Sequence, residues 1–163
     1  YLDFARGEGR EEAAPVDLAG LIADAVTAAR RGGAHVHFNP PRPRLVDALA
    51  RVPLRPNAMR RALSNVLANA QRHATTVEVS IEADLEEREV DILIDDDGPG
   101  VAPALREDAF RPFVRLDEGR NLQKGGHGLG LAIARDVLRG GGGDCALEDS
   151  PRGGLRVRMR LPL

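Results

Sequence analysis

The stretch Asn65-Val-Leu-Ala-Asn69-Ala-Gln-Arg-His73 decides the fold of this chain, because two glycine-rich segments follow it in a telling order. Those segments are DDDGPG at 95–100 and GGHGLGLAIA at 125–134. Each of the three is weak evidence alone, since Asn, Asp and Gly are common in turns and at helix ends. In this order, however, amides on a helix, an acidic turn and a glycine-led helix are typical of a nucleotide-binding site.

The helix predicted over 56–73 carries a polar stripe opposite an apolar face. The apolar face consists of Met59, Leu63, Val66, Leu67 and Ala70, and the stripe of Arg61, Asn65, Asn69 and Arg72. Asn65 and Asn69 are adjacent on the stripe, an amide oxygen suits Mg²⁺, and Arg72 could bind a phosphate with two hydrogen bonds. A solvated helix face would explain the same residues, but Asn is a poor helix former, so two of them in mid-helix favour a site.

The acidic segment DDDGPG follows a strand that is predicted to be buried. Three adjacent carboxylates, at 95–97, repel one another unless donors or a cation satisfy them. A carboxylate here could accept a hydrogen bond from a purine amino group, while the glycines let the backbone approach the ring. An ordinary acidic turn or a calcium-type loop is the alternative interpretation.

The third segment places glycines at the beginning of an apolar helix, predicted to start near Gly128. The first backbone N–H groups of such a helix lie at the positive end of its dipole and bind anions such as phosphate. No Lys-Ser or Lys-Thr follows, as a Walker A loop requires, and no strand enters the segment directly, as in a dinucleotide-binding turn. The polar stretch at 114–126 before it is long enough to form a lid over a ligand.

The remaining pattern predicts an α+β fold, a two-layer α/β sandwich with helices packed on one face of a mixed, mostly antiparallel sheet. Strands are predicted at 34–38, 49–54, 76–83, 90–94, 145–148 and 155–161. Pro53 places the second of them at a sheet edge. A further helix is capped by Asp17 and ends at Gly32, and a short one begins at Pro103. Residues 6–15 are polar with Gly and Pro, which predicts a loop or linker.

The composition of the 163 residues fits one globular domain. The chain is 42% hydrophobic but has only four Phe and one Tyr, so its core must be aliphatic. A net charge of −2, with arginines interspersed among acids, argues against a nucleic-acid partner. Cys145 is the only cysteine, which excludes an internal disulfide and favours a reducing, cytoplasmic compartment. No apolar run has membrane-spanning length, so direct membrane contact by this domain is not expected.

With these segments the chain resembles the histidine-kinase branch of the superfamily that includes gyrase, heat-shock chaperone and mismatch-repair ATPases, which implies the Bergerat fold. The resemblance covers essentially the whole chain. The matching boxes are the N box at 65–73, the G1 box at 96–100, the F box at 110–113 and the G2 box at 126–130, with the closing hairpin turn at 152–155. The sequences PFVR and GLGLAI are most similar to EnvZ-type osmosensor kinases.

The resemblance implies catalytic and metal-binding roles on the N-box helix. Asn69 would coordinate the Mg²⁺ that bridges the phosphates of ATP, and Asn65 would support it. Arg72 would contact phosphate, and His73 would lie near the nucleotide.

Further roles follow for the other boxes. Asp96 would hydrogen-bond the adenine amino group, with Gly98 and Gly100 shaping the pocket, and Phe110 and Phe113 would anchor the base of the lid. Arg115 and Lys124 are candidate phosphate contacts from the lid. The phosphates would be wrapped by Gly126, His127, Gly128, Leu129 and Gly130. The family usually has Thr or Ser at the position of His127, so a hydroxyl donor is lost there, and the imidazole either contacts phosphate or points outward.

Asn65 stands where the sister ATPases carry a Glu that activates water as general base. An amide cannot accept that proton, so the site is expected to hold Mg-ATP and offer its γ-phosphate to an external nucleophile. None of the four histidines has the sequence typical of a phosphoacceptor helix. The acceptor histidine is therefore expected on a dimerisation domain upstream of Tyr1, with residues 1–15 as the end of its helix and a linker, and 16–163 as the ATP-binding catalytic domain.

The expected partners are this dimerisation domain and a downstream response regulator. The fragment is expected to be monomeric and the full-length protein a homodimer; a cytoplasmic location is expected for the domain, and the sequence allows an inner-membrane parent. Two other functions fit the pattern: a serine kinase of the anti-sigma-factor type, and an ATP-binding pseudokinase that serves as a regulatory docking module. The intact Asn69, Asp96 and glycines argue against the pseudokinase.

Overall fold

A computed structural model describes residues 11–113 and 128–163. The strands are β1 (Ala14–Val16), β2 (Val36–Phe38), β3 (Val52–Leu54), β4 (Val77–Asp84), β5 (Glu89–Asp96), β6 (Asp144–Asp149) and β7 (Leu155–Pro162). The α-helices are α2 (Leu18–Arg31), α3 (Val46–Leu49), α4 (Pro56–His73) and α5 (Gly130–Gly140). Three single-turn 3₁₀ helices are η2 (Pro43–Leu45), η3 (Pro103–Leu105) and η4 (Asp108–Phe110).

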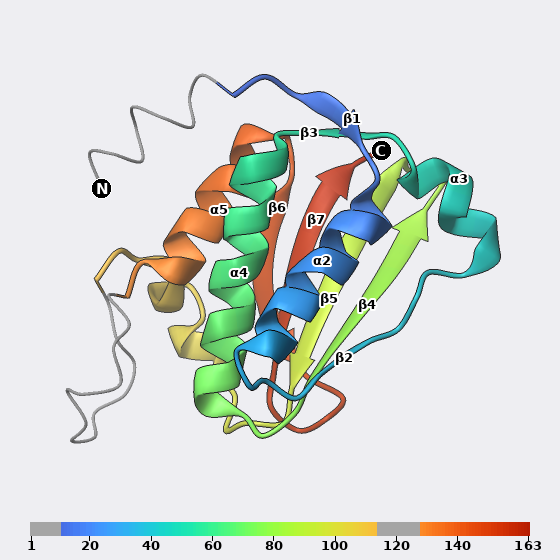
Figure 1. Cartoon of the computed structure of the whole chain (residues 1–163). Helices are drawn as coiled ribbons and strands as arrows, with labels where there is room; N and C mark the ends of the chain where they lie inside the picture. The colour runs from blue at the N-terminus through green and yellow to red at the C-terminus, as the bar shows by residue number, and fades with distance from the viewer. Residues whose placement is uncertain (1–10, 114–127) are drawn as a thin grey trace.

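The elements form two layers. One is a five-stranded sheet in the order β2-β4-β5-β7-β6, in which β2 and β4 are parallel and the other neighbours antiparallel. The other consists of α2, α4 and α5, which lie side by side across one face of that sheet (Figure 1). The predicted two-layer sandwich with a mixed, mostly antiparallel sheet is confirmed. No helix within 11–113 or 128–163 combines the length and apolar character needed to span a membrane.

The core between the layers is aliphatic, as the composition requires. Strand β7 alternates, and its odd-numbered side chains Leu155, Val157, Met159 and Leu161 are buried. They belong to the same core cluster as the apolar face of α4, whose buried residues are Ala58, Met59, Ala62, Leu63, Val66, Leu67 and Ala70. Burying this stripe leaves the opposite side of α4, with its two asparagines, beside α5. Packing therefore fixes which face of α4 is available to a ligand.

The segment predicted as a loop or linker is partly a strand. Residues 14–16 form β1, which pairs antiparallel with β3 in a separate two-stranded sheet. Just before it, the Glu11 carboxylate accepts hydrogen bonds from the backbone N–H groups of Asn57 (2.9 Å) and Ala58 (3.0 Å). Because Arg55 offers no side-chain cap, Glu11 is the acidic cap of α4.

Several other boundaries also differ from the prediction. Leu49, predicted in a strand, is the last residue of α3, and only 52–54 of that stretch are extended. The hairpin of β4 and β5 is longer than predicted, since Asp84 pairs with Glu89. Its turn is tight because the Asp84 carboxylate accepts hydrogen bonds from the backbone of Glu86 and Glu87.

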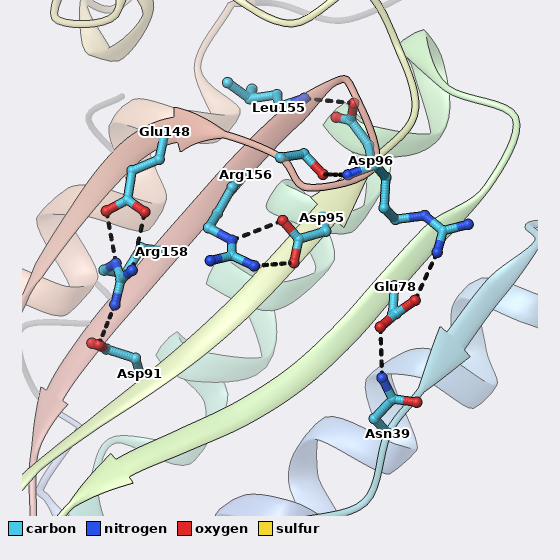
Figure 2. A network of polar contacts seen from close by, with 11 residues as sticks. Asn39, Glu78, Asp91, Asp95, Asp96, Glu148, Leu155, Arg156 and Arg158 are labelled. Atoms are coloured by element: carbon cyan, nitrogen blue, oxygen red, sulfur yellow. Dashed lines mark hydrogen bonds and ion pairs between the residues drawn. The ribbon is translucent and has the colours of Figure 1, made fainter.

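On the face of the sheet away from the helices, arginines of β7 alternate with acids of the neighbouring strands (Figure 2). Arg156 holds Asp95 with two bonds of 2.8 Å, and Arg158 reaches both Asp91 and Glu148. Hydrogen bonding from Arg158 keeps the pKa of Glu148 below its usual range. These pairs satisfy the charges within the sheet and fix its register on that face.

Candidate nucleotide-binding site

The beginning of α5 lies against the middle of α4. A Cβ atom at Gly130 would lie 3.5 Å from Cβ of Asn65 and 3.6 Å from its carbonyl oxygen. The residue before the helix, Leu129, gives no side-chain cap. The uncapped N-terminus of α5, which favours anions, is thus next to Asn65.

Asn65 carries an unusual polar atom. Within the part of the chain that the structure describes, its Nδ2 is the one buried side-chain nitrogen or oxygen without a hydrogen-bond partner. A buried donor left unpaired costs about 1–3 kcal/mol. Such a cost is retained where a ligand provides the partner, and a phosphate beside the start of α5 is one that the geometry suits.

The other N-box residues follow along the exposed side of α4. Asn69 is half-buried one turn after Asn65, Arg72 is exposed, and His73 is half-buried at the last helical position. At a rise of 1.5 Å per residue, the eight steps from Asn65 to His73 span about 12 Å. The second half of α4 therefore runs from the start of α5, beside Asn65, to the end of β5, beside His73.

Asp96 lies at the end of β5 and is 3% exposed. Its Oδ1 accepts hydrogen bonds from the backbone of Gly98 (2.9 Å) and Leu155 (3.0 Å), which fix the carboxylate. Figure 2 shows the bond from Leu155. Over residues 11–113 and 128–163, Oδ2 has no hydrogen-bond partner. The carboxylate is thus held by one oxygen and has the other available to a donor such as an amino group.

The glycines around Asp96 are required by close backbone packing. A Cβ atom at Gly98 would lie 2.6 Å from the carbonyl oxygen of His73, so α4 and the acidic turn touch there. Gly100 has a φ of +72°, a conformation that L side chains rarely adopt. The residues predicted to form the adenine pocket, at 73 and 96–100, therefore come together.

Gly154 belongs to the same cluster and is absent from the predicted site residues. A Cβ atom there would overlap Oδ1 of Asp96 and lie 2.5 Å from the nitrogen of Gly98. The resemblance included the turn at 152–155 but gave no reason to separate Gly154 from Gly153. The structure separates them: Gly153 has open space around it and a φ of +94°, whereas Gly154 is buried against the site.

The three adjacent carboxylates are satisfied by donors of the chain itself. Asp95 pairs with Arg156, and Asp96 accepts the two backbone bonds described above. Asp97 accepts hydrogen bonds from the backbone of Thr75 and Thr76 and from the Thr76 hydroxyl at 2.7 Å. These bonds, those of Thr76 first, lower the pKa of Asp97 to about 2. Asp97 therefore anchors the turn after α4, and Asp96 is the carboxylate with an oxygen to spare.

The F-box phenylalanines differ in environment. Phe110 is buried, whereas the ring of Phe113 is 67% exposed. The backbone nitrogen of Phe113 donates a 3.0 Å hydrogen bond to the carbonyl oxygen of Gly128, and both residues have positive φ. Phe113 thus joins its segment to the start of α5 through its backbone. Of the other predicted site residues, Arg115, Lys124, Gly126 and His127 lie outside the described residues.

The chain is similar in sequence to known proteins over about two thirds of its length. Residues 55–163 match the family described as histidine kinase-, DNA gyrase B-, and HSP90-like ATPase. The sensor histidine kinase CpxA of Escherichia coli K12 is 48% identical over 109 residues, 66% of this chain and 23% of CpxA. The chain thus spans about a quarter of the length of that relative.

Solved structures extend the similarity over nearly the whole chain. The ATP-binding domain of PrrB from Mycobacterium tuberculosis is 31% identical with a TM-score of 0.73, covering 93% of this chain and 97% of that one. The histidine kinase domain of the Escherichia coli osmosensor EnvZ is 29% identical with a TM-score of 0.62, covering 94% and 89%. The resemblance to EnvZ-type kinases is confirmed. The chain belongs to the family of histidine kinase-, DNA gyrase B- and HSP90-like ATPases, and within it the chain is similar to the ATP-binding domains of sensor histidine kinases.

Proposed function

We propose that this domain binds Mg-ATP and transfers the γ-phosphoryl group to a histidine on the dimerisation domain of its parent protein. The bond between the γ-phosphorus and the β,γ-bridging oxygen breaks, a P–N bond to the imidazole forms, and ADP leaves. The observation that carries the proposal is the buried, unpartnered amide of Asn65 beside the start of α5. An amide can donate to a phosphate oxygen but cannot take a proton from water, so the site favours transfer over hydrolysis.

The residues on α4 fit a magnesium ion. Asn69 presents a neutral, hard oxygen donor one turn from Asn65, and Mg²⁺ in nucleotide sites takes few protein ligands in addition to phosphate oxygens and waters. We assign Asn69 as the direct ligand and Asn65 as its support. When bound, the ion supplies neutralisation of the charge that develops on the transferring phosphate.

The nucleotide would lie along α4, with its phosphates at the start of α5 and its base beside Asp96. The free oxygen of Asp96 would accept a hydrogen bond from the adenine amino group, in the pocket shaped by Gly98, Gly100 and Gly154. Arg72 and His73 would contact the nucleotide from the last turn of α4. The glycine loop at 126–130, with Arg115, Lys124 and His127, would contact the phosphates.

The proposed partners are the dimerisation domain of the parent protein and a response regulator that takes the phosphoryl group from it. The segment before Glu11 would connect this domain to the dimerisation domain, and dimerisation would belong to the latter. We propose a cytoplasmic location for the domain and an inner-membrane location for its parent protein. A serine kinase of the anti-sigma-factor type is not favoured, because the relatives are sensor kinases.

The test is transfer from γ-labelled ATP to the parent's dimerisation domain, supplied as a separate polypeptide. Transfer is expected with Mg²⁺, and it is expected to be lost on chelation and in Asn69→Ala. Unchanged phosphoryl transfer by Asn69→Ala would contradict the assignment of Asn69 as the magnesium ligand. ATP binding without transfer to any acceptor would favour the pseudokinase.

A further inference from the structure

Arg135 of α5 contacts three residues from two different segments at once, η4 and the start of β6. Its guanidinium carbon lies 4.1 Å from the centre of the Phe110 ring, a cation–π distance. Nη1 and Nη2 bind the two carboxylate oxygens of Glu107 at 2.5 and 3.0 Å, and Nε lies 3.1 Å from Oδ1 of Asp144. Only 15% of the arginine side chain is exposed. A planar, bidentate and stacked arginine of this kind is not replaceable by a simple positive charge.

These contacts join the segment before residue 114 to the helix after residue 127. Glu107 and Phe110 lie in and next to η4, and Arg135 lies one turn into α5. A second link joins the same two segments, since the backbone nitrogen of Phe113 donates to the oxygen of Gly128. The charged clamp and the backbone bond together fix η4 against the start of α5.

The start of α5 is where the phosphate end of the site lies. Gly130 packs on Asn65, so any shift of α5 along or about its axis changes the distance between its N–H groups and that amide. A small misplacement of groups that bind charge weakens binding strongly, because hydrogen bonds depend on distance and angle. Arg135 contacts neither Asn65 nor Asp96, and it acts on the phosphate end of the site through the position of the helix.

We propose that Arg135 is a positioning residue, which sets the phosphate-binding start of α5 by locking this helix to Phe110 and Glu107. The inference rests on the proposed nucleotide site. It predicts a loss that is specific for the phosphate part of the ligand, because the pocket around Asp96 is built by β5, β7 and the end of α4 instead.

Arg139 provides a matched control one turn further along α5. It binds the same Asp144 through Nε at 3.0 Å, and 55% of its side chain is exposed. In the described part of the chain it contacts neither Phe110 nor Glu107. Arg139→Gln therefore removes a similar charge from the same helix and the same acidic partner, but leaves η4 attached.

The experiment measures the dissociation constants of ATP and of adenosine by calorimetry for the whole chain, together with Tm. Arg135→Gln is expected to raise the dissociation constant of ATP roughly three- to tenfold, which is the size of a lost cation–π or ion-pair contact. The dissociation constant of adenosine is expected to rise less than about twofold. Arg135→Lys is expected to recover part of the loss, and Arg139→Gln to bind both ligands as the wild type does. If Arg135→Gln does not fold, Glu107→Gln removes the same clamp from its exposed side.

The outcomes separate the inference from the function on which it rests. Unchanged ATP affinity in Arg135→Gln, equal losses for ATP and adenosine, or an equal loss in Arg139→Gln would each overturn the positioning role. A wild-type chain that binds neither ligand would instead overturn the nucleotide site, and the inference with it.

Discussion

A side chain at Gly154 would overlap Oδ1 of Asp96, the oxygen that already accepts hydrogen bonds from the backbone of Gly98 and Leu155. The turn between β6 and β7 thus reaches the predicted adenine carboxylate through backbone atoms alone. Two parts of the chain that are far apart in sequence define one rigid group, and neither tolerates even a methyl group between them.

Gly154→Ala is therefore expected to destabilise the fold and to weaken adenine-nucleotide binding. Forcing an extra carbon into close-packed surroundings costs about 1–3 kcal/mol, and the carboxylate of Asp96 must move to make room. Urea denaturation measures the first effect and calorimetric titration with ATP the second. Gly153→Ala is the control, because it strains a positive φ but meets open space. Equal ATP affinities in the two variants would contradict the role of Gly154.

Asp96→Asn is expected to weaken ATP binding with little loss of stability. The amide oxygen can still accept the bonds from Gly98 and Leu155, while an NH₂ donor replaces the free oxygen and faces the adenine amino group. The affinity for a purine nucleotide without the exocyclic amine should change much less. Asp97→Asn is the neighbouring control, since Asp97 anchors Thr75 and Thr76 instead. An equal loss for both purines would count against the adenine contact.

Asn65→Leu is expected to leave Tm unchanged or raise it, and to reduce phosphoryl transfer. Leucine has nearly the shape of asparagine, is a better helix former and removes a buried donor that lacks a partner. A gain in stability with a loss of function is typical of a residue kept for its ligand. Ser64→Ala, on the exposed side of the same helix, controls for helix propensity alone. A large fall in Tm would show that the Asn65 amide stabilises the fold itself.

The stability of the domain is expected to fall between about pH 4 and pH 2, with Asp97 as one contributor. Its folded pKa of about 2 lies below the ordinary value of 3.8, because Thr76 and Thr75 donate to the carboxylate. The contribution is therefore fully present above the ordinary pKa and is lost as pH falls through the folded one. Tm measured against pH should fall less steeply in Asp97→Asn than in the wild type. Parallel curves for Asp97→Asn and the wild type would contradict the assignment.

The sequence predicted the parts of the fold that carry a periodic signal. Helix α4 and the strands β5 and β7 repeat their apolar residues locally, so their existence follows from spacing alone. Strand β1 has three residues, too few for a period, and exists because it pairs with β3 across a long separation. The end of α3 at Leu49 has the same cause, since an apolar residue in a short segment suits a helix or a strand equally well.

The candidate site was predictable where residue types are unusual for their position. A chemical role is indicated by two asparagines within one helix, and also by an aspartate that directly precedes a glycine-rich turn. Gly154 could not be found this way, because its requirement arises from Asp96, a distant neighbour in sequence. Arg135 resembles any surface charge on an amphipathic helix until the ring of Phe110 is placed beside it.

The capping of α4 by Glu11 makes the first turn of this helix dependent on a single residue that lies 46 positions before Asn57. The helix that carries both asparagines therefore does not begin autonomously. Anything that pulls β1 away from β3 also frees the amides of Asn57 and Ala58, and their hydrogen-exchange rates would report such a displacement directly. The state of the N-terminal segment can therefore be measured at the first turn of α4, to which the Glu11 carboxylate connects it.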